Sequence, residues 1–167
     1  MTRTRKKSQK LWKQAQRYMP GGVNSPVRAF KGVGGSPIFV ERGKGCKIWD
    51  ADGNEYIDFH NCYTTMILGH ANPKVVAAVR EQAGKGTAFG ALIPAVAPWA
   101  ESICNMVDSV DKVRFNNSGT ESVMMAIRLA RGLSGKDMLL KTDGCYHGAY
   151  DPVVYPTDAT GLSRGNQ

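Results

Sequence analysis

The chain has 167 residues, of which 42% are hydrophobic, and its formal net charge is +8. This length predicts one domain, or one domain and a piece of another, and the hydrophobic content excludes disorder throughout the chain. Because a compact chain of this size buries roughly 68–70% of its unfolded surface, we expect a hydrophobic core that needs no disulfide or metal support.

The positive charge is concentrated at the N-terminus. Residues 1–31 hold nine Lys or Arg and no acidic residue, whereas residues 32–167 hold thirteen basic and fourteen acidic residues. We therefore predict that residues 1–18 form a solvated basic arm or helix. The neutral remainder disfavours nucleic acid as a partner, because such an interface needs basic surface on the folded body as well. An Arg-rich mitochondrial presequence stays open as an alternative.

The cysteines and the hydropathy pattern bear on the compartment. No stretch approaches the ~20 consecutive apolar residues of a membrane span, which disfavours a membrane protein. The cysteines form no CxxC pair and no metal-ligand set; they are Cys46, Cys62, Cys104 and Cys145. We expect a reduced, cytoplasmic protein without a bound metal.

Residues 19–66 are predicted to form an antiparallel segment that carries a loop. The loop is the run from Pro20 to Pro26, where two prolines and two glycines exclude a helix or a central strand. Apolar segments follow at 38–40, 46–49 and 56–59. Asp52-Gly53 separates the last two of these segments and is a strong hairpin signal.

Residues 67–167 follow a different pattern, which we interpret as the start of a larger α/β domain. Apolar spacing predicts helices over 73–84 and 98–108, and then a strand over 113–115, a helix over 120–131 and a strand over 138–140. The last three elements are typical of a βαβ unit with two parallel strands. In such a unit a ligand binds at the carboxyl ends of the strands. The helix over 120–131 is apolar on more than one side, so we expect it to be buried against the sheet.

The junction between the strand and the helix at residues 115–121 carries the first chemical signal. The N–H groups at a helix start have no partner within the helix and favour an anion, and Gly119 allows close approach of the backbone. Ser118 and Thr120 add hydroxyl donors, so phosphate is the natural ligand. The alternative is that Ser118 or Thr120 is only the N-cap of the helix. The segment matches neither a P-loop nor the GxGxxG fingerprint, which disfavours a nucleotide.

A second polar loop, residues 143–148, follows the strand predicted over 138–140. It places the Tyr146 ring and the His147 imidazole near the same sheet edge as the phosphate site. Phosphate at a helix terminus with an aromatic ring stacked on a flat ligand is the arrangement of a pyridoxal phosphate site. The alternative is a loop whose polar groups only satisfy nearby backbone.

Five motifs in order make the chain resemble the N-terminal part of class-III aminotransferases, and within them the glutamate-1-semialdehyde 2,1-aminomutases. The motifs appear in the family's order and at similar spacing, and the resemblance extends from about residue 11 to about residue 150. They are Pro20-Gly21-Gly22-Val23-Asn24-Ser25-Pro26-Val27-Arg28-Ala29-Phe30, Ile48-Trp49-Asp50-Ala51-Asp52-Gly53, Leu68-Gly69-His70-Ala71-Asn72-Pro73, Asn117-Ser118-Gly119-Thr120-Glu121 and Gly144-Cys145-Tyr146-His147-Gly148.

The resemblance implies a fold-type I enzyme that uses pyridoxal 5'-phosphate and forms a homodimer with active sites at the subunit interface. It also implies that the enzyme acts on a small amino donor and on a keto or aldehyde substrate. By motif match, the cofactor phosphate would be held by Ser118, Gly119 and Thr120, and the cofactor ring would lie against Tyr146 and His147. A substrate carboxylate would meet Arg28, with Ser25 nearby, because the planar guanidinium can bind a carboxylate in a bidentate manner.

Two departures from the family leave the substrate open. Where the aminomutases have Gly-Ser-Trp-Gly-Pro, this chain has residues 61–65, Asn-Cys-Tyr-Thr-Thr, so that an aromatic substrate contact persists only as Tyr63. After Gly148 the family continues to a glycine-rich lid, whereas this chain continues through Asp151-Pro152 to Tyr155 and Gly161. Aminomutase and transaminase both remain possible.

The family's Schiff-base lysine and the aspartate at the pyridine nitrogen have no counterpart in this chain. No lysine follows Lys141, and no earlier lysine matches that motif. We therefore expect an N-terminal portion of a longer enzyme that contains no catalytic residue and is inactive alone. The alternative is a truncated, non-catalytic relative that serves as a dimerisation or binding module.

Overall fold

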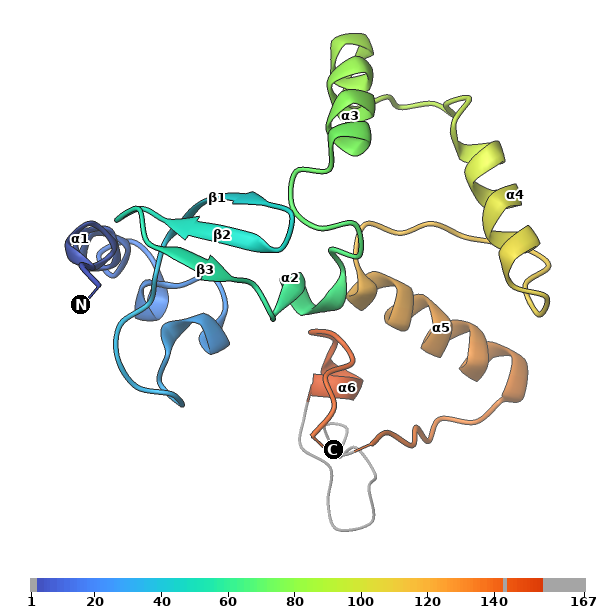
Figure 1. Cartoon of the computed structure of the whole chain (residues 1–167). Helices are drawn as coiled ribbons and strands as arrows, with labels where there is room; N and C mark the ends of the chain where they lie inside the picture. Colours follow the sequence, from blue (N-terminus) through green and yellow to red (C-terminus); the bar gives the residue numbers. More distant parts are fainter. Residues whose placement is uncertain (1–2, 143, 155–167) are drawn as a thin grey trace. The chain divides into compact units, whose positions relative to one another are not determined.

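The computed structural model describes residues 3–142 and 144–154 of the chain (Figure 1). Tyr155 and Gly161, which the sequence comparison singled out, lie outside the described residues. The internal contacts divide the chain into two units, Met1–Gly90 and Ala91–Gln167.

The first unit contains a three-stranded antiparallel sheet in the order β1-β2-β3. The strands are β1 (Val40–Lys44), β2 (Lys47–Asp50) and β3 (Glu55–Ile57). Gly53 has φ +85°, a value that favours glycine, in the tight turn between β2 and β3. The hairpin predicted from Asp52-Gly53 is thus confirmed.

Asp50, at the end of β2, is fully buried and organises this turn. Its Oδ1 accepts hydrogen bonds from the backbone N–H groups of Asp52 at 3.0 Å and Asn54 at 2.8 Å, and its Oδ2 accepts one from the Tyr56 hydroxyl at 2.8 Å. Burial alone would raise the pKa of Asp50, but the hydrogen bonds from Asn54, Tyr56 and Asp52 outweigh it and lower this pKa below 3.8.

Helix α1 (Lys6–Ala15) lies in the predicted basic arm and is fixed to the sheet by a carboxylate. Asp52 Oδ1 accepts from the N–H of Lys7 at 2.8 Å, and Asp52 Oδ2 accepts from the N–H of Ser8 at 2.9 Å. Arg5, the N-cap residue, makes no side-chain hydrogen bond to the helix. Asp52, more than forty positions away in the sequence, takes this role and satisfies two of the helix's first N–H groups. Ser8 itself is fully buried.

Three short helical turns and one longer helix complete this unit. They are the 3-10 turns η1 (Pro20–Gly22) and η2 (Pro26–Ala29), the turn α2 (Asn61–Thr64) and the helix α3 (Pro73–Lys85). Asn72 caps α3, because its Oδ1 accepts from the N–H of Lys74 at 3.0 Å. The helix predicted over 73–84 is confirmed.

The second unit contains α4 (Val96–Met106), α5 (Gly119–Ser134) and α6 (Asp151–Val154). The helices predicted over 98–108 and 120–131 are confirmed within a few residues at each end. The strand predicted over 113–115 is wrong, and that over 138–140 is reduced to a single β-bridge residue, Leu140, since the sheet of the described residues contains only β1, β2 and β3. A strand needs a hydrogen-bonded neighbour, and the described residues pair no second strand with either segment.

The predicted hydrophobic core is also wrong for the described part of the chain. Its buried apolar side chains are those of Ala29, Pro37, Ile127 and Val153, and Leu129 on α5 is 64% exposed instead of packed against a sheet. Among the described helices, none is long and apolar enough to span a membrane.

Candidate functional site

The N-terminus of α5 is organised by a reciprocal capping box. Ser118 Oγ accepts from the N–H of Glu121 at 3.2 Å, and Glu121 Oε2 accepts from the N–H of Ser118 at 3.0 Å. The N-cap role considered for Ser118 is therefore confirmed.

The next two N–H groups, of Gly119 and Thr120, have no acceptor among the described residues. A Cβ added at Gly119 would meet nothing within 4 Å, so the backbone at this residue is not covered on its Cβ side. The helix terminus keeps free donors and positive dipole for an anion while its own cap is complete.

The loop that carries Tyr146 and His147 is fastened to this helix terminus. The N–H of Ala149 donates to Thr120 Oγ1 at 3.1 Å. Gly148 has φ +103°, and a Cβ there would lie 2.8 Å from Thr120 Oγ1 and 2.9 Å from Thr120 Cα. Only glycine permits this approach, so the structure brings together the two segments that the sequence singled out.

Two side chains of this loop have groups without a partner among the described residues. His147 Nε2 is buried and has no hydrogen-bond partner among the described residues. A buried polar atom of this kind needs a hydrogen-bond partner, and the part of the chain that the structure describes does not provide one. The Tyr146 ring is 80% exposed, so its face is free for stacking. Free N–H donors, the uncovered backbone at Gly119 and an orphaned imidazole nitrogen fit a flat ligand that carries a phosphate.

A cavity that the sequence did not predict lies beside the same helix start. The rings of Trp99 and Phe115 stack with centroids 3.9 Å apart and an interplanar angle of 17°. Together with Asn117, Met124 and other residues, they line a volume of about 470 Å³. Trp99 and Phe115 lie on different segments of the chain, so the sequence did not predict that their rings stack.

The predicted substrate contacts lie in the first unit. Arg28 lies in the turn η2, and Ser25 is the N-cap residue of this turn. The Ser25 carbonyl accepts from the N–H of Arg28 at 3.0 Å, and the Arg28 side chain is exposed. Tyr63 lies on α2, is 54% exposed and packs edge-on against His60 with ring centroids 4.1 Å apart. No hydrogen bond among the described residues joins Tyr63 to η2, and the roles of Ser25, Arg28 and Tyr63 stay predictions.

Comparison with solved structures gives the class of fold. A transaminase with pyridoxal phosphate bound matches 96% of this chain and 37% of its own length, with a TM-score of 0.86 and 39% identity. An omega-transaminase from Sphaerobacter thermophilus matches 87% of this chain and 33% of its own, with a TM-score of 0.80 and 42% identity. The chain thus has the fold of the N-terminal third of these fold-type I aminotransferases.

Sequence comparison narrows this class to a family. The model of the class-III aminotransferases matches residues 30–164, and the chain belongs to this family of pyridoxal-phosphate enzymes. The chain is also 55% identical over 148 residues to the glutamate-1-semialdehyde 2,1-aminomutase of Aquifex aeolicus. That alignment covers 89% of this chain but 35% of the relative, so the chain spans about a third of the relative's length. The resemblance found in the sequence is confirmed.

Proposed function

We propose that this chain supplies the phosphate-binding part of a pyridoxal-phosphate site in an aminotransferase or aminomutase of the glutamate-1-semialdehyde aminomutase type. The observation that carries the proposal is the bond from the Ala149 N–H to Thr120 Oγ1, which fastens the Tyr146 loop to the start of α5. When bound, the cofactor would supply an electron sink for chemistry at an amino-bearing carbon.

The residues would divide the work of binding. The N–H groups of Gly119 and Thr120 would donate to the phosphate, and the hydroxyls of Ser118 and Thr120 can still donate while they accept their present hydrogen bonds. Tyr146 would cover one face of the ring, and His147 would offer Nε2 at its edge. Arg28, with Ser25 and Tyr63, would orient a substrate that bears a carboxylate.

We further infer that the 167-residue chain does not catalyse transamination by itself. No lysine of this chain matches the family's Schiff-base motif, so the group that would form a covalent bond with the cofactor is absent from it. The chain would hold the cofactor through non-covalent contacts only. A borohydride-stable adduct on one specific lysine would contradict this inference.

The binding proposal can be tested with a ligand that cannot react with surface lysines. Pyridoxamine 5'-phosphate carries the ring and the phosphate but no aldehyde, so calorimetric titration of the 167-residue chain reports non-covalent binding alone. We expect binding of pyridoxamine 5'-phosphate and at least about tenfold weaker binding of pyridoxamine, because charge-assisted phosphate hydrogen bonds are worth about 1.5–3 kcal/mol each.

Variants of the helix terminus separate the phosphate contacts from the fold. Thr120→Val should weaken the phosphate ligand more than pyridoxamine. The matched control is Ser122→Ala, two residues further on, which removes an exposed hydroxyl that accepts from Asn116 Nδ2. Equal affinity for the two ligands, or equal effects of both variants, would contradict the assignment of this terminus to phosphate.

The alternative function, a dimerisation or binding module, is favoured by one observation in the first unit. Residues of the segment 65–76 line an apolar groove of about 270 Å³, beside which Ile67 is 86% exposed and Leu68 is 67% exposed. Under this alternative the chain associates with a second copy through this groove. Sedimentation velocity should then show a dimer that Leu68→Asp dissociates, in a chain that does not bind pyridoxamine 5'-phosphate.

A further inference from the structure

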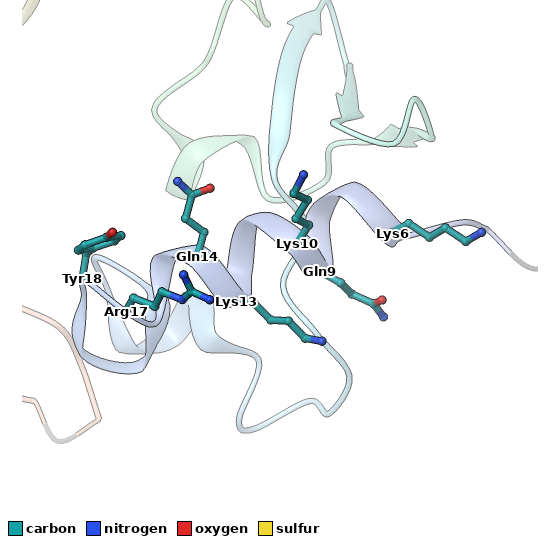
Figure 2. Close-up of a pocket in the computed structure, with 7 residues that line it drawn as sticks. All are labelled: Lys6, Gln9, Lys10, Lys13, Gln14, Arg17 and Tyr18. Atoms are coloured by element: carbon teal, nitrogen blue, oxygen red, sulfur yellow. The ribbon is translucent and has the colours of Figure 1, made fainter.

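We propose that the basic face of α1 is a docking surface for a short acidic helical segment of a partner protein. This face is a groove of about 570 Å³ along the helix and the turn after it (Figure 2). It contains four cations, two amides and one aromatic ring, and acidic and aliphatic residues are absent from its lining. The lining residues are Lys6, Gln9, Lys10, Lys13, Gln14, Arg17 and Tyr18.

The four cations follow a regular helical spacing. Lys6, Lys10, Lys13 and Arg17 are separated by four, three and four residues, which places them on one side of a helix. Backbone bonds from the N–H of Gln16 to the Trp12 carbonyl at 2.9 Å and from the N–H of Arg17 to the Gln14 carbonyl at 3.1 Å continue the coil beyond Ala15. At 1.5 Å per residue, the stripe is about 16 Å long.

These cations are available for a partner. The ion pairs of the described residues join Lys47 to Glu55, Lys85 to Glu81 and His70 to Asp58, and none of them involves the groove. Nearby cations are already engaged within the unit: the guanidinium of Arg3 lies 4.6 Å from the centre of the Tyr56 ring, and Arg5 Nη1 donates to the Ser36 carbonyl at 3.4 Å.

The opposite side of the helix fixes the stripe in place. Ser8 is fully buried, and its hydroxyl accepts from the N–H of Phe39 at 3.4 Å. Trp12 Nε1 donates to the Gly21 carbonyl at 3.4 Å, and a Cβ at Gly22 would lie 2.8 Å from the Trp12 ring. The basic face is therefore presented by an anchored helix, which lowers the entropy cost of binding.

Charge and composition favour a short acidic protein segment over other anions. A membrane-binding helix needs apolar residues beside its cations, and this groove contains none apart from the Tyr18 ring. A long polyanion would extend past the stripe onto the body of the chain, where residues 32–167 carry a net charge of −1. Three turns of a helix with glutamates at the same spacing match the stripe, and Gln9 and Gln14 can donate to their carboxylates.

The proposal is tested by fluorescence anisotropy with a labelled alanine-based helical peptide whose four glutamates are spaced by four, three and four residues. The control peptide has the same composition with the glutamates scattered around the helix. We expect the 167-residue chain to bind the spaced peptide at least about threefold more tightly at low salt, with the difference shrinking as the Debye length falls to about 8 Å at physiological ionic strength.

Matched variants locate the binding site. The double variant Lys10→Gln, Lys13→Gln should weaken the spaced peptide by about three- to tenfold, since each exposed pair contributes a factor of about 1.5 to 5. The control, Lys112→Gln with Lys136→Gln, removes the same charge from exposed positions elsewhere in the chain and should leave affinity unchanged.

Three outcomes would overturn the proposal. They are equal affinity for the spaced and scattered peptides, equal loss in both double variants, and tighter binding of a single-stranded oligonucleotide that depends on the exposed Tyr18 ring. Because the readout involves neither cofactor nor activity, failure here is independent of the proposed cofactor site.

Discussion

Four consecutive residues without glycine adopt left-handed backbone conformations at the start of the segment that departs from the family pattern. The φ values are +48° at Asn61, +50° at Cys62, +56° at Tyr63 and +68° at Thr64. Each such residue costs roughly 1–2 kcal/mol for an L-amino acid, and β-branched Thr64 is the least suited. Strain of this kind is often stored at functional sites, and here it surrounds Tyr63, the predicted substrate contact.

Thr64→Gly is therefore expected to stabilise the chain, since glycine adopts φ +68° without steric cost. After the entropy cost of glycine in the unfolded chain, the net gain should be about 0.5–1 kcal/mol in the free energy of unfolding. The control is Thr65→Gly, at a residue with φ −80°, which should destabilise the chain. Urea unfolding measures both, and stabilisation by the control but not by Thr64→Gly would show that the strain argument is wrong.

Asp58 links this strained turn to the sheet. Its Oδ1 accepts from the N–H groups of His60 at 3.0 Å and Asn61 at 2.9 Å, and its Oδ2 lies 2.7 Å from His70 Nε2. The hydrogen bond to His70, followed by that from Asn61, lowers the pKa of Asp58 below its ordinary value of 3.8. The bond to His70 could not be predicted from the sequence, because the two residues pair through the fold, whereas the bonds from His60 and Asn61 are local.

This lowered pKa gives a pH dependence with a definite sign. Between the lowered pKa and 3.8 the unfolded chain binds more protons than the folded one, so stability is present above pH 3.8 and is lost as the pH falls through the lowered value. Asp58→Asn should lower the melting temperature at neutral pH by about 2–4 °C and flatten its decline in acid. Melting curves between neutral and acid pH measure this, with the exposed Asp111→Asn as the control; an unchanged slope in Asp58→Asn would contradict it.

At the scale of elements, the start of α5 serves both the fold and the proposed site. Ser118 was predicted either to cap the helix or to bind phosphate, and the capping box shows the first role without preventing the second. The two roles have different requirements. The N-cap side chain needs a hydrogen-bond acceptor, which a carboxylate provides as well as a hydroxyl. A bound phosphate, in contrast, is repelled by a carboxylate at this position.

Ser118 substitutions should therefore separate the two roles. Ser118→Ala is expected to cost about 1 kcal/mol of stability through loss of the cap. Ser118→Asp should keep stability within a few tenths of a kcal/mol, since aspartate caps as well as serine, yet weaken pyridoxamine 5'-phosphate at least about tenfold. Thermal unfolding and calorimetric titration give the two readouts, and retention of phosphate binding in Ser118→Asp would exclude a ligand at this terminus.

The elements that the sequence predicted correctly are those whose signals are local. Asp52-Gly53 specified the β2–β3 turn, and Ser118 with Glu121 specified the start of α5, because three or four residues suffice to satisfy those hydrogen bonds. The wrong elements, the strands at 113–115 and 138–140, need pairing partners that are distant in the chain. The left-handed turn at 61–64 was equally beyond prediction, since no glycine or proline marks it.

At the scale of the whole molecule, the exposure of large apolar side chains decides how much the hydrophobic effect stabilises the fold. Large apolar side chains such as Leu133 at 80% and Met138 at 72% lie in water, although their segments carry the apolar patterns of buried elements. The hydrophobic effect contributes in proportion to the area removed from water, so these exposed side chains contribute little to the stability of the described units. The predicted core depended on the number of apolar residues, whereas burial depends on what covers them.

Denaturant and heat should therefore reveal an unusually small change in exposed area on unfolding. The urea m-value scales with that area, so the 167-residue chain at micromolar concentration should give less than about half the m-value of a compact domain of the same length. The heat capacity change should be reduced in the same proportion, well below about 12–15 cal/mol/K per residue. If copies of the chain cover one another's apolar faces, both quantities will rise with protein concentration, and the midpoint will shift with them. An m-value of ordinary size that is independent of concentration would mean that the single chain buries its apolar faces within itself, contrary to the exposures of Leu129, Leu133 and Met138.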